Sequence, residues 1–464
     1  MPTVDIVTRR DDIPKHRGAA TVRPGLIPRQ PLAMVLLLAM LLSPVLTVLN
    51  NGDTITIGQT VLPGLRAYDS LSGAVGGLMA VIPMLLGRKL LARPEDARRL
   101  LSVLVVAGSA YTLLALYEIR MSPQMNNMVY GFFPHSWIQH VRNGGYRPLV
   151  FLSHGLWLAI FFSACIVAAA GLWRLGGARR GLFLLATLWL LGTLILSKSL
   201  GALVITLALL ALMLLTGQRL KLLAGIVVAG LMLGYPALRA NDMIPVERVM
   251  TLAGSLNPER AASLQVRLDN EDKMLAKAME RPLFGWGGWS RSRVLNEDGL
   301  DHGIADGYWV ITIGVKGWFG YLAEVGLLTL PLLLLALSSR RGPIPPEAMV
   351  LALILMGNLI DMIPNATLTP ITWLVVGALW GQLETIRSRS TAGTDAAAAV
   401  VAGRPPAMPG AIPAAGGYAR PAPATLPAGQ MAQAAAPPST PPAARQAYTR
   451  QTERRHRVDR RPQE

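Results

Sequence analysis

Two arginines in the second half of the chain have side chains suited to binding an anion rich in phosphate oxygens. Arg267 lies within an expected amphipathic helix that begins with the N-cap pattern Asn257-Pro258-Glu259, and Arg281 closes that helix. A guanidinium group is planar, permanently charged and able to donate paired hydrogen bonds to phosphate. The pattern therefore favours a pyrophosphate site. The alternative is a helix lying on a membrane surface, with Arg267 paired to Glu271 one turn further on.

A glycine-rich segment, Pro282 to Trp289, follows this helix directly. Its glycines either satisfy the geometry of a tight turn or let backbone amides approach an anion. Trp286 and Trp289 are typical of membrane-interface anchors, and contact with a glycan or lipid is the alternative. Beyond the turn, Arg291 and Arg293 add two further cations. The acids after them lack the spacing of a calcium loop, so we expect no metal site.

The rest of the chain has the composition of a membrane protein. Its 464 residues are 52% hydrophobic and only 15% charged, with a mean hydropathy of +0.40. The net charge of +17 falls in short clusters between apolar runs and in both tails, which indicates topology rather than a nucleic-acid surface. We expect an all-α polytopic protein with about ten transmembrane helices, near 31–49, 71–87, 100–119, 149–173, 181–197, 200–216, 222–238, 320–338, 347–363 and 370–386.

The basic clusters orient these spans. With a cytoplasmic amino terminus, the clusters around Arg88, Arg179, Arg219, Arg340 and Arg387 all fall inside. This scheme places both termini in the cytoplasm and leaves one large outer loop containing the amphipathic helix. The expected regions are a basic N-terminal tail at 1–30, helices one to seven at 31–238, the outer loop at 239–319, helices eight to ten at 320–389, and a disordered Ala/Pro-rich cytoplasmic tail at 390–464.

One apolar stretch is too long for a single span. From Asp306 to Leu337, about 32 residues at about 1.5 Å each would exceed a hydrocarbon core of about 30 Å. We therefore expect a break at Gly317 to Gly320, with Asp306 to Lys316 forming an interfacial helix. Glu324 would be costly in lipid, and we expect it to pair with a partner such as Lys316.

In detail over residues 180 to 340, and by topology elsewhere, the chain resembles the bacterial O-antigen ligase and polysaccharide polymerase superfamily. The resemblance rests on the order of Arg267, an Ala-rich helix end and the segment Pro282 to Gly287, followed by Asp306, Gly317 and Gly320. Leu196 to Ala202, which includes Lys198, resembles the cationic turn that follows a helix in this family.

The resemblance implies transfer of glycan from a polyprenyl pyrophosphate carrier at the periplasmic face of a bacterial inner membrane, without a cofactor. Fixed cations would stabilise the departing pyrophosphate, and a general base would assist the acceptor hydroxyl. The expected base is Asp306 or, second, His302, although Asp306 is also a favoured N-cap residue. The expected pyrophosphate contacts are Arg267, Arg281, Lys198, Arg291 and Arg293.

Ligases of this family usually carry a histidine and a small polar residue where this chain has Asp306-Gly307. This departure favours a polymerase, acting on another lipid-linked repeat unit, over a ligase that transfers polymer to a lipid core. Arg142 and Arg147, in an outer loop, would meet lipid phosphates or the acceptor glycan. A transporter or flippase is the alternative of another class, although matched repeats are not evident. The cytoplasmic tail could also dock a polysaccharide-export partner.

Overall fold

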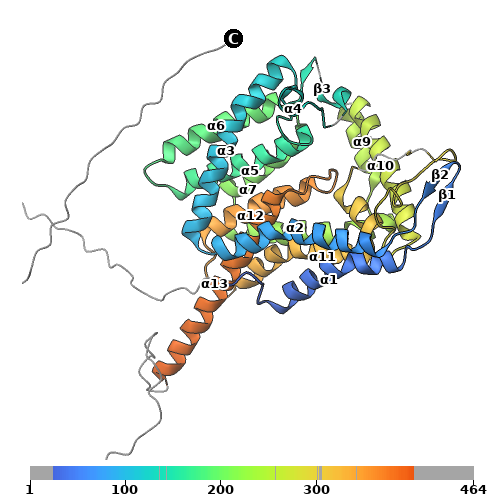
Figure 1. The fold of residues 1–464 in the computed structure, drawn as a ribbon. Coiled ribbons are helices and arrows are strands. Elements are labelled where there is room, and N and C mark those ends of the chain that lie inside the picture. The colour runs from blue at the N-terminus through green and yellow to red at the C-terminus, as the bar shows by residue number, and fades with distance from the viewer. Residues whose placement is uncertain are drawn as a thin grey trace, which may run out of the picture. The chain divides into compact units, whose positions relative to one another are not determined.

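The computed structural model describes residues 24–134, 136–142, 144–256, 258–299, 301, 306–340 and 342–401, and this part of the chain is helical with two short hairpins (Figure 1). The predicted all-α architecture is confirmed. The helices are α1 (Pro31–Leu49), α2 (Ala67–Leu90), α3 (Pro94–Met121), α4 (Met125–Tyr130), a 3₁₀ turn η1 (Trp137–His140), α5 (Gly155–Leu175), α6 (Arg180–Leu196), α7 (Leu200–Leu215), α8 (Gln218–Ala240), α9 (Val246–Leu256), α10 (Pro258–Met279), α11 (Tyr308–Ser338), α12 (Pro346–Asp361) and α13 (Pro370–Val401). The strands are β1 (Ile55–Ile57), β2 (Thr60–Leu62), β3 (Val141–Arg142) and β4 (Gly145–Tyr146), paired as two antiparallel hairpins.

Each of the ten apolar segments expected from the sequence coincides with a helix. Six helices in the described residues are long and apolar enough to cross a membrane, namely α1, α2, α3, α5, α8 and α11, and α6 and α7 are shorter apolar helices. The chain is thus a multi-pass membrane protein by length and composition. Ten spans remain a prediction, because α6, α7, α12 and α13 are not among these six helices.

Two predicted boundaries are wrong. The fourth span begins at Gly155 rather than at 149, because the Glu118 carboxylate accepts the backbone N–H groups of Leu149 and Val150 at 2.9 and 2.7 Å and holds them outside the helix. At the other end, α13 continues to Val401, so the region from 390 does not begin as a disordered tail. Alanines 396 to 399 favour that continuation, since alanine has the highest helix propensity. Residues 402–464 and 1–23 lie outside the described residues.

Basic residues lie together at one end of the helices. Arg98, at the start of α3, donates to the Gly176 carbonyl after α5 at 2.7 Å, and Arg174 in α5 donates to the Leu214 carbonyl in α7 at 2.9 Å. These contacts bring two of the expected cytoplasmic clusters to the same end. That arrangement agrees with the positive-inside argument, which needs such clusters on one side of the bilayer.

Helix α11 breaks where the sequence predicts. Gly317 has φ +64° and ψ −173°, so the helical path is interrupted between the segment from Tyr308 and the long apolar segment that follows. α1 packs against both α2 and α11 (Figure 1). The turn that docks on the kink contacts the carboxyl end of α1 and the loop after it, since Thr47 donates to the Phe284 carbonyl at 2.7 Å and Asn51 to the Gly285 carbonyl at 2.8 Å.

The long loop contains two helices where one was expected. The predicted amphipathic helix is present as α10, although its predicted N-cap Asn257 lies outside the described residues. A preceding helix, α9, was not predicted. After α10 the chain contacts the β1–β2 hairpin, where the Thr60 hydroxyl donates to the Gly299 carbonyl at 3.2 Å.

Candidate functional site

The predicted leaving-group cation, Arg267, and the predicted base, Asp306, lie in contact with each other. Arg267, in α10, has its Nε 3.4 Å from Oδ2 of Asp306, which precedes α11, and the two side chains are 37% and 33% exposed. The predicted alternatives for both are wrong in this geometry. Arg267 pairs with Asp306 rather than with Glu271, and Gly307 rather than Asp306 occupies the N-cap position of α11.

A second layer of charge lies beneath this pair. Glu271 is one turn along α10 from Arg267 and is buried, with Arg239 of α8 at 3.9 Å. Burial raises the pKa of the Glu271 carboxyl to about 7, and the Arg239 charge only partly offsets this. Arg239 also bonds Asp272 at 2.5 Å, which fixes α10 to the end of α8. The sequence predicts Glu271 only as a partner for Arg267 and carries no signal of its burial.

A further carboxylate completes the surroundings of Arg267. Asp361, at the end of α12, accepts hydrogen bonds from Asn365 at 3.0 Å and Thr367 at 2.6 Å, and it lies within electrostatic range of Arg267. Arg267 is therefore the one cation that acts on all three of these carboxylates within the described residues, whereas Arg239 acts on Glu271 as well. This arrangement holds its guanidinium in place without a fully buried salt bridge.

The glycine-rich turn after α10 docks on the kink of α11 by backbone hydrogen bonds. The amides of Trp286 and Gly287 donate to the carbonyls of Gly314 and Val315 at 2.8 and 2.9 Å. In return, the amides of Trp318 and Phe319 donate to the carbonyls of Pro282 and Leu283 at 2.7 and 3.1 Å. The backbone groups that the kink releases are thus satisfied by the turn.

The close approach of the turn to the kink explains why glycine occupies positions 285 and 317. Gly285 has φ +68°, and a Cβ placed on it would lie 2.5 Å from the Gly317 nitrogen; a Cβ on Gly317 would lie 2.4 Å from the Leu283 carbonyl. The turn-geometry interpretation is therefore confirmed for these residues. The amides of Trp286 and Gly287 donate hydrogen bonds to α11, so they are not available to an anion.

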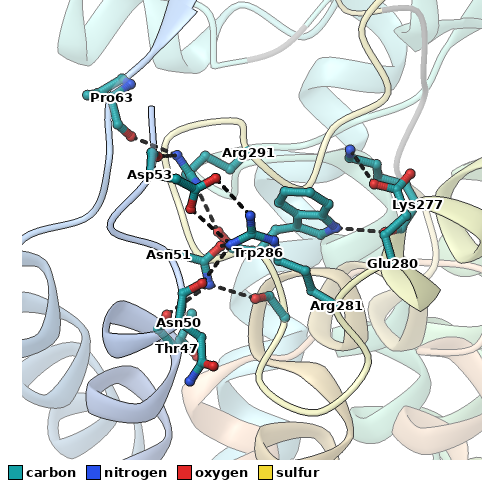
Figure 2. A network of polar contacts seen from close by, with 11 residues as sticks. Thr47, Asn50, Asn51, Asp53, Pro63, Lys277, Glu280, Arg281, Trp286 and Arg291 are labelled. Atoms are coloured by element: carbon teal, nitrogen blue, oxygen red, sulfur yellow. Dashed lines mark hydrogen bonds and ion pairs between the residues drawn. The ribbon is translucent and has the colours of Figure 1, made fainter. Parts of the chain in front are cut away.

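Arg281 and Arg291 converge on one carboxylate that the sequence reading did not single out. Figure 2 shows both guanidinium groups pointing toward Asp53, which follows α1. Arg281 bonds it at 2.8 Å and Arg291 at 3.2 Å. Arg281 also donates to the Asn50 carbonyl and the Asn51 side chain at 2.6 and 2.7 Å. The Arg281 hydrogen bond holds the pKa of Asp53 below its usual range.

Arg291 stabilises the fold and does not face an open binding surface. Its side chain is 0% exposed, and it donates to the carbonyls of Asp53 and Pro63 at 2.8 and 3.0 Å. The predicted contact of Arg291 with a pyrophosphate is therefore wrong in this geometry. Asp53 was missed because a single acid in a short loop carries no periodic or motif signal in the sequence.

The two tryptophans of the turn differ in exposure. Trp286 is buried, donates to the Lys277 carbonyl at 2.7 Å and lies under the Arg281 guanidinium, 4.2 Å from its ring centroid (Figure 2). Its predicted contact with glycan or lipid is therefore wrong. Trp289 is 65% exposed and donates to Asp69 at 2.8 Å. Together with Lys316 it lines a cavity of about 370 Å³ whose other walls come from α1 and α2.

The expected partner of Glu324 is confirmed. Lys316 bonds one Glu324 oxygen at 2.5 Å, and the Tyr308 hydroxyl donates to the other at 2.7 Å. These contacts cross the kink of α11, since Tyr308 and Lys316 precede Gly317 and Glu324 follows it. The kink is thus fixed from both sides, and Tyr308 lies two positions after Asp306.

Other predicted residues lie around the β3–β4 hairpin. Lys198 lies in the turn between α6 and α7 with φ +56°, and its carbonyl accepts from Arg147 at 3.4 Å. Arg147 is buried, with 6% of its surface exposed, and its contact with lipid phosphates or the acceptor glycan stays a prediction. Arg142 lies in β3, and its side chain is outside the described residues. The structure groups Lys198 with this hairpin through its contacts.

The two remaining predicted residues lie in the segment before α11. Arg293 contacts Asp301 at 3.5 Å with both side chains partly exposed. His302, the second expected base, lies outside the described residues.

No family model matches this chain, and no curated protein matches it.

Proposed function

We propose that this chain transfers glycan from a polyprenyl pyrophosphate to another lipid-linked repeat unit, as a polysaccharide polymerase of the periplasmic face of a bacterial inner membrane. The observation that carries the proposal is the Arg267–Asp306 contact at 3.4 Å between two partly exposed side chains. The transfer needs a cation for the leaving group and a base for the acceptor. These two groups supply both within one site.

The reaction gives each group a defined task. The acceptor hydroxyl oxygen bonds to the anomeric carbon, the bond from that carbon to the pyrophosphate oxygen breaks, and the carrier pyrophosphate leaves with the electron pair. Asp306 takes the hydroxyl proton. Arg267 stabilises the negative charge that grows on the leaving group, an interaction stronger in the transition state than in the ground state.

The resting contact suggests how substrate activates the site. A pyrophosphate carries more charge than a carboxylate and draws the Arg267 guanidinium toward itself. Asp306 then loses its partner, and its carboxylate is free to accept the hydroxyl proton. Lys198 and Arg293 remain predicted contacts for the same leaving group, whereas Arg281 and Arg291 hold the turn in place through Asp53.

The topology belongs to the proposal. Ten spans, with the loop 239–319 periplasmic and both termini cytoplasmic, place Arg267 and Asp306 at the outer headgroup level. The gathering of Arg98 and Arg174 contacts at the other end of the helices supports this orientation. The cavity between α1 and α2 offers an apolar wall to the isoprenoid chain, and Lys316 and Trp289 are among its lining residues.

A deletion strain tests the function. Single repeat units that persist on the carrier at the periplasmic face would support the polymerase. Complete polymer that never reaches a lipid core would instead identify a ligase. Repeat units retained on the cytoplasmic face would identify a flippase and overturn the transferase proposal.

A further inference from the structure

A second polar cavity lies far along the helices from the proposed transferase site. The ends of α5 and α7 and the starts of α8 and α12 enclose a space of about 400 Å³. Its polar lining is Arg174, Gln218 and Lys221, and its apolar lining includes Leu175, Met213, Ile344 and Val350. A polar rim over an apolar wall is the environment of a lipid headgroup and the first carbons of its chains.

All charged residues that line this cavity are positive. Its lining contains two cations and no carboxylate. The four helices that form it contain one acid near this end, Glu347 in the first turn of α12, and Glu347 is not part of the lining. A bound anion would balance Arg174 and Lys221, which otherwise repel each other.

The burial of Lys221 indicates a ligand more strongly than the positive charge of the lining does. It is nine-tenths buried, with 9% of its surface exposed, and it lines the cavity. Within the described part of the chain its ammonium group has no hydrogen bond or ion pair. An anion in the cavity would stabilise the ammonium group of this mostly buried side chain.

The neighbouring groups are already arranged to receive an anion. Arg174 donates to the Leu214 carbonyl at 2.9 Å, which fixes its guanidinium beside the end of α7. α8 begins at Gln218 after Gly217, which offers no side-chain cap, and its first turn contains no acid. The free amides of that turn add partial positive charge at the cavity.

We propose that Arg174 and Lys221 bind the phosphate of an anionic phospholipid at this end of the helices. The lipid site shares no residue with the proposed transferase site, so loss of one leaves the other intact. Under the proposed topology it lies in the inner leaflet, where basic pockets between transmembrane helices recognise anionic headgroups. The apolar lining favours a lipid over a soluble phosphate ion.

The test is lipid retention by the full chain, purified in neutral detergent and measured by native mass spectrometry. Phosphatidylglycerol and phosphatidylcholine with identical acyl chains are offered in equal amounts. We expect wild-type protein to retain phosphatidylglycerol preferentially. Lys221→Gln should reduce that preference about fivefold, since one Lys or Arg near an anionic membrane surface changes the affinity by about that factor. The double variant Arg174→Gln/Lys221→Gln should abolish it.

Arg219→Gln is the matched control, because Arg219 is an exposed residue of the same helix outside the lining, and it should retain the wild-type preference. Lys221→Arg keeps the charge and should retain binding as well. Equal retention of both lipids by the wild type would overturn the proposal without any variant. Displacement of phosphatidylglycerol by millimolar inorganic phosphate would reassign the site to a soluble anion and overturn the lipid assignment.

Discussion

The Arg267 Nε lies 3.4 Å from Asp306 Oδ2 and joins α10 to the start of α11 across a segment that includes the glycine-rich turn. The contact is loose for an ion pair and both side chains are partly exposed, so it contributes little to stability by itself. A pair that adds little to the fold is free to exchange partners when substrate binds.

Separate loss of each group should therefore reduce transfer. Asp306→Asn removes the base, and we expect a loss of about 10²-fold or more in rate. Arg267→Ala removes the leaving-group cation, with an expected loss of about 10²- to 10³-fold. Arg267→Lys should recover part of that loss, since it restores charge without the planar fork. The measurement is polymer formed by a complemented deletion strain at matched protein level.

The controls lie on the same loop. Asp269→Asn and Arg248→Gln change exposed residues of α10 and α9 and should leave polymer formation unchanged. Full activity of both Asp306→Asn and Arg267→Ala would remove the assignment of the site.

Glu271 should make stability depend on pH. Its pKa is about 7 in the folded protein against an ordinary value of about 4.3. Between these values the unfolded state has lost its proton and the folded state keeps it, so stability falls as pH rises toward 7 and then levels off. The midpoint of thermal unfolding in detergent, followed from pH 4.5 to 8, measures this.

Glu271→Gln should flatten that fall, because the amide does not titrate. The exposed Asp269 on the same helix provides the comparison, and Asp269→Asn should keep the wild-type profile. Equal slopes for wild type and Glu271→Gln would show that the buried carboxyl does not hold a proton near neutral pH.

The glycines that join the turn to the kink should not tolerate a side chain. Gly285→Ala and Gly317→Ala each place a Cβ within 2.6 Å of backbone atoms at a positive φ. We expect each to cost at least about 1 to 3 kcal/mol, since neither the left-handed backbone nor the facing backbone can yield cheaply. Gly288→Ala is the matched control, because a Cβ there meets nothing within 4 Å. Melting midpoints equal to wild type for all three would contradict the docked turn.

Asp53 should stabilise the loop that carries the turn. Arg291 is fully buried and Arg281 is partly buried, and both form ion pairs with this carboxylate (Figure 2). Asp53→Ala should lower stability by about 1 to 3 kcal/mol, the range for hydrogen bonds to charged groups. Asp298→Asn alters an exposed acid whose contacts are local to Asn296 and should be neutral. A loss no larger than that of Asp298→Asn would show that the two arginines are held without Asp53.

Local patterns in the sequence predicted the elements of this fold well. Apolar runs located ten helices, the length argument located the break at Gly317, and the cost of Glu324 in lipid predicted its contact with Lys316. Each of these depends on residues close together in the chain. Helix α9 was missed because its short apolar pattern lies inside a long polar loop.

Long-range contacts in the candidate site were harder to predict. Arg267 and Asp306 were both named, but their contact depends on how α10 packs against α11, and the local alternative with Glu271 looked equally good on a helix wheel. Arg291 and Trp286 were expected to face substrate because their residue types suit it. In the structure both are buried, with Arg291 bonded to Asp53 and Trp286 bonded to the Lys277 carbonyl, and neither partner carries a signal in the sequence.

The orientation of the loop decides whether the site can meet a periplasmic substrate, and the chain suits a labelling test. Its one cysteine, Cys165, is 0% exposed, so wild-type protein should stay unlabelled by a membrane-impermeant maleimide. Asp298→Cys, exposed in the loop before α11, should react in intact cells. Arg99→Cys, whose native side chain is 80% exposed at the basic end, should react only after the inner membrane is opened. The reverse pattern would place Arg267 and Asp306 in the cytosol, where a lipid-linked glycan awaiting polymerisation would not reach them.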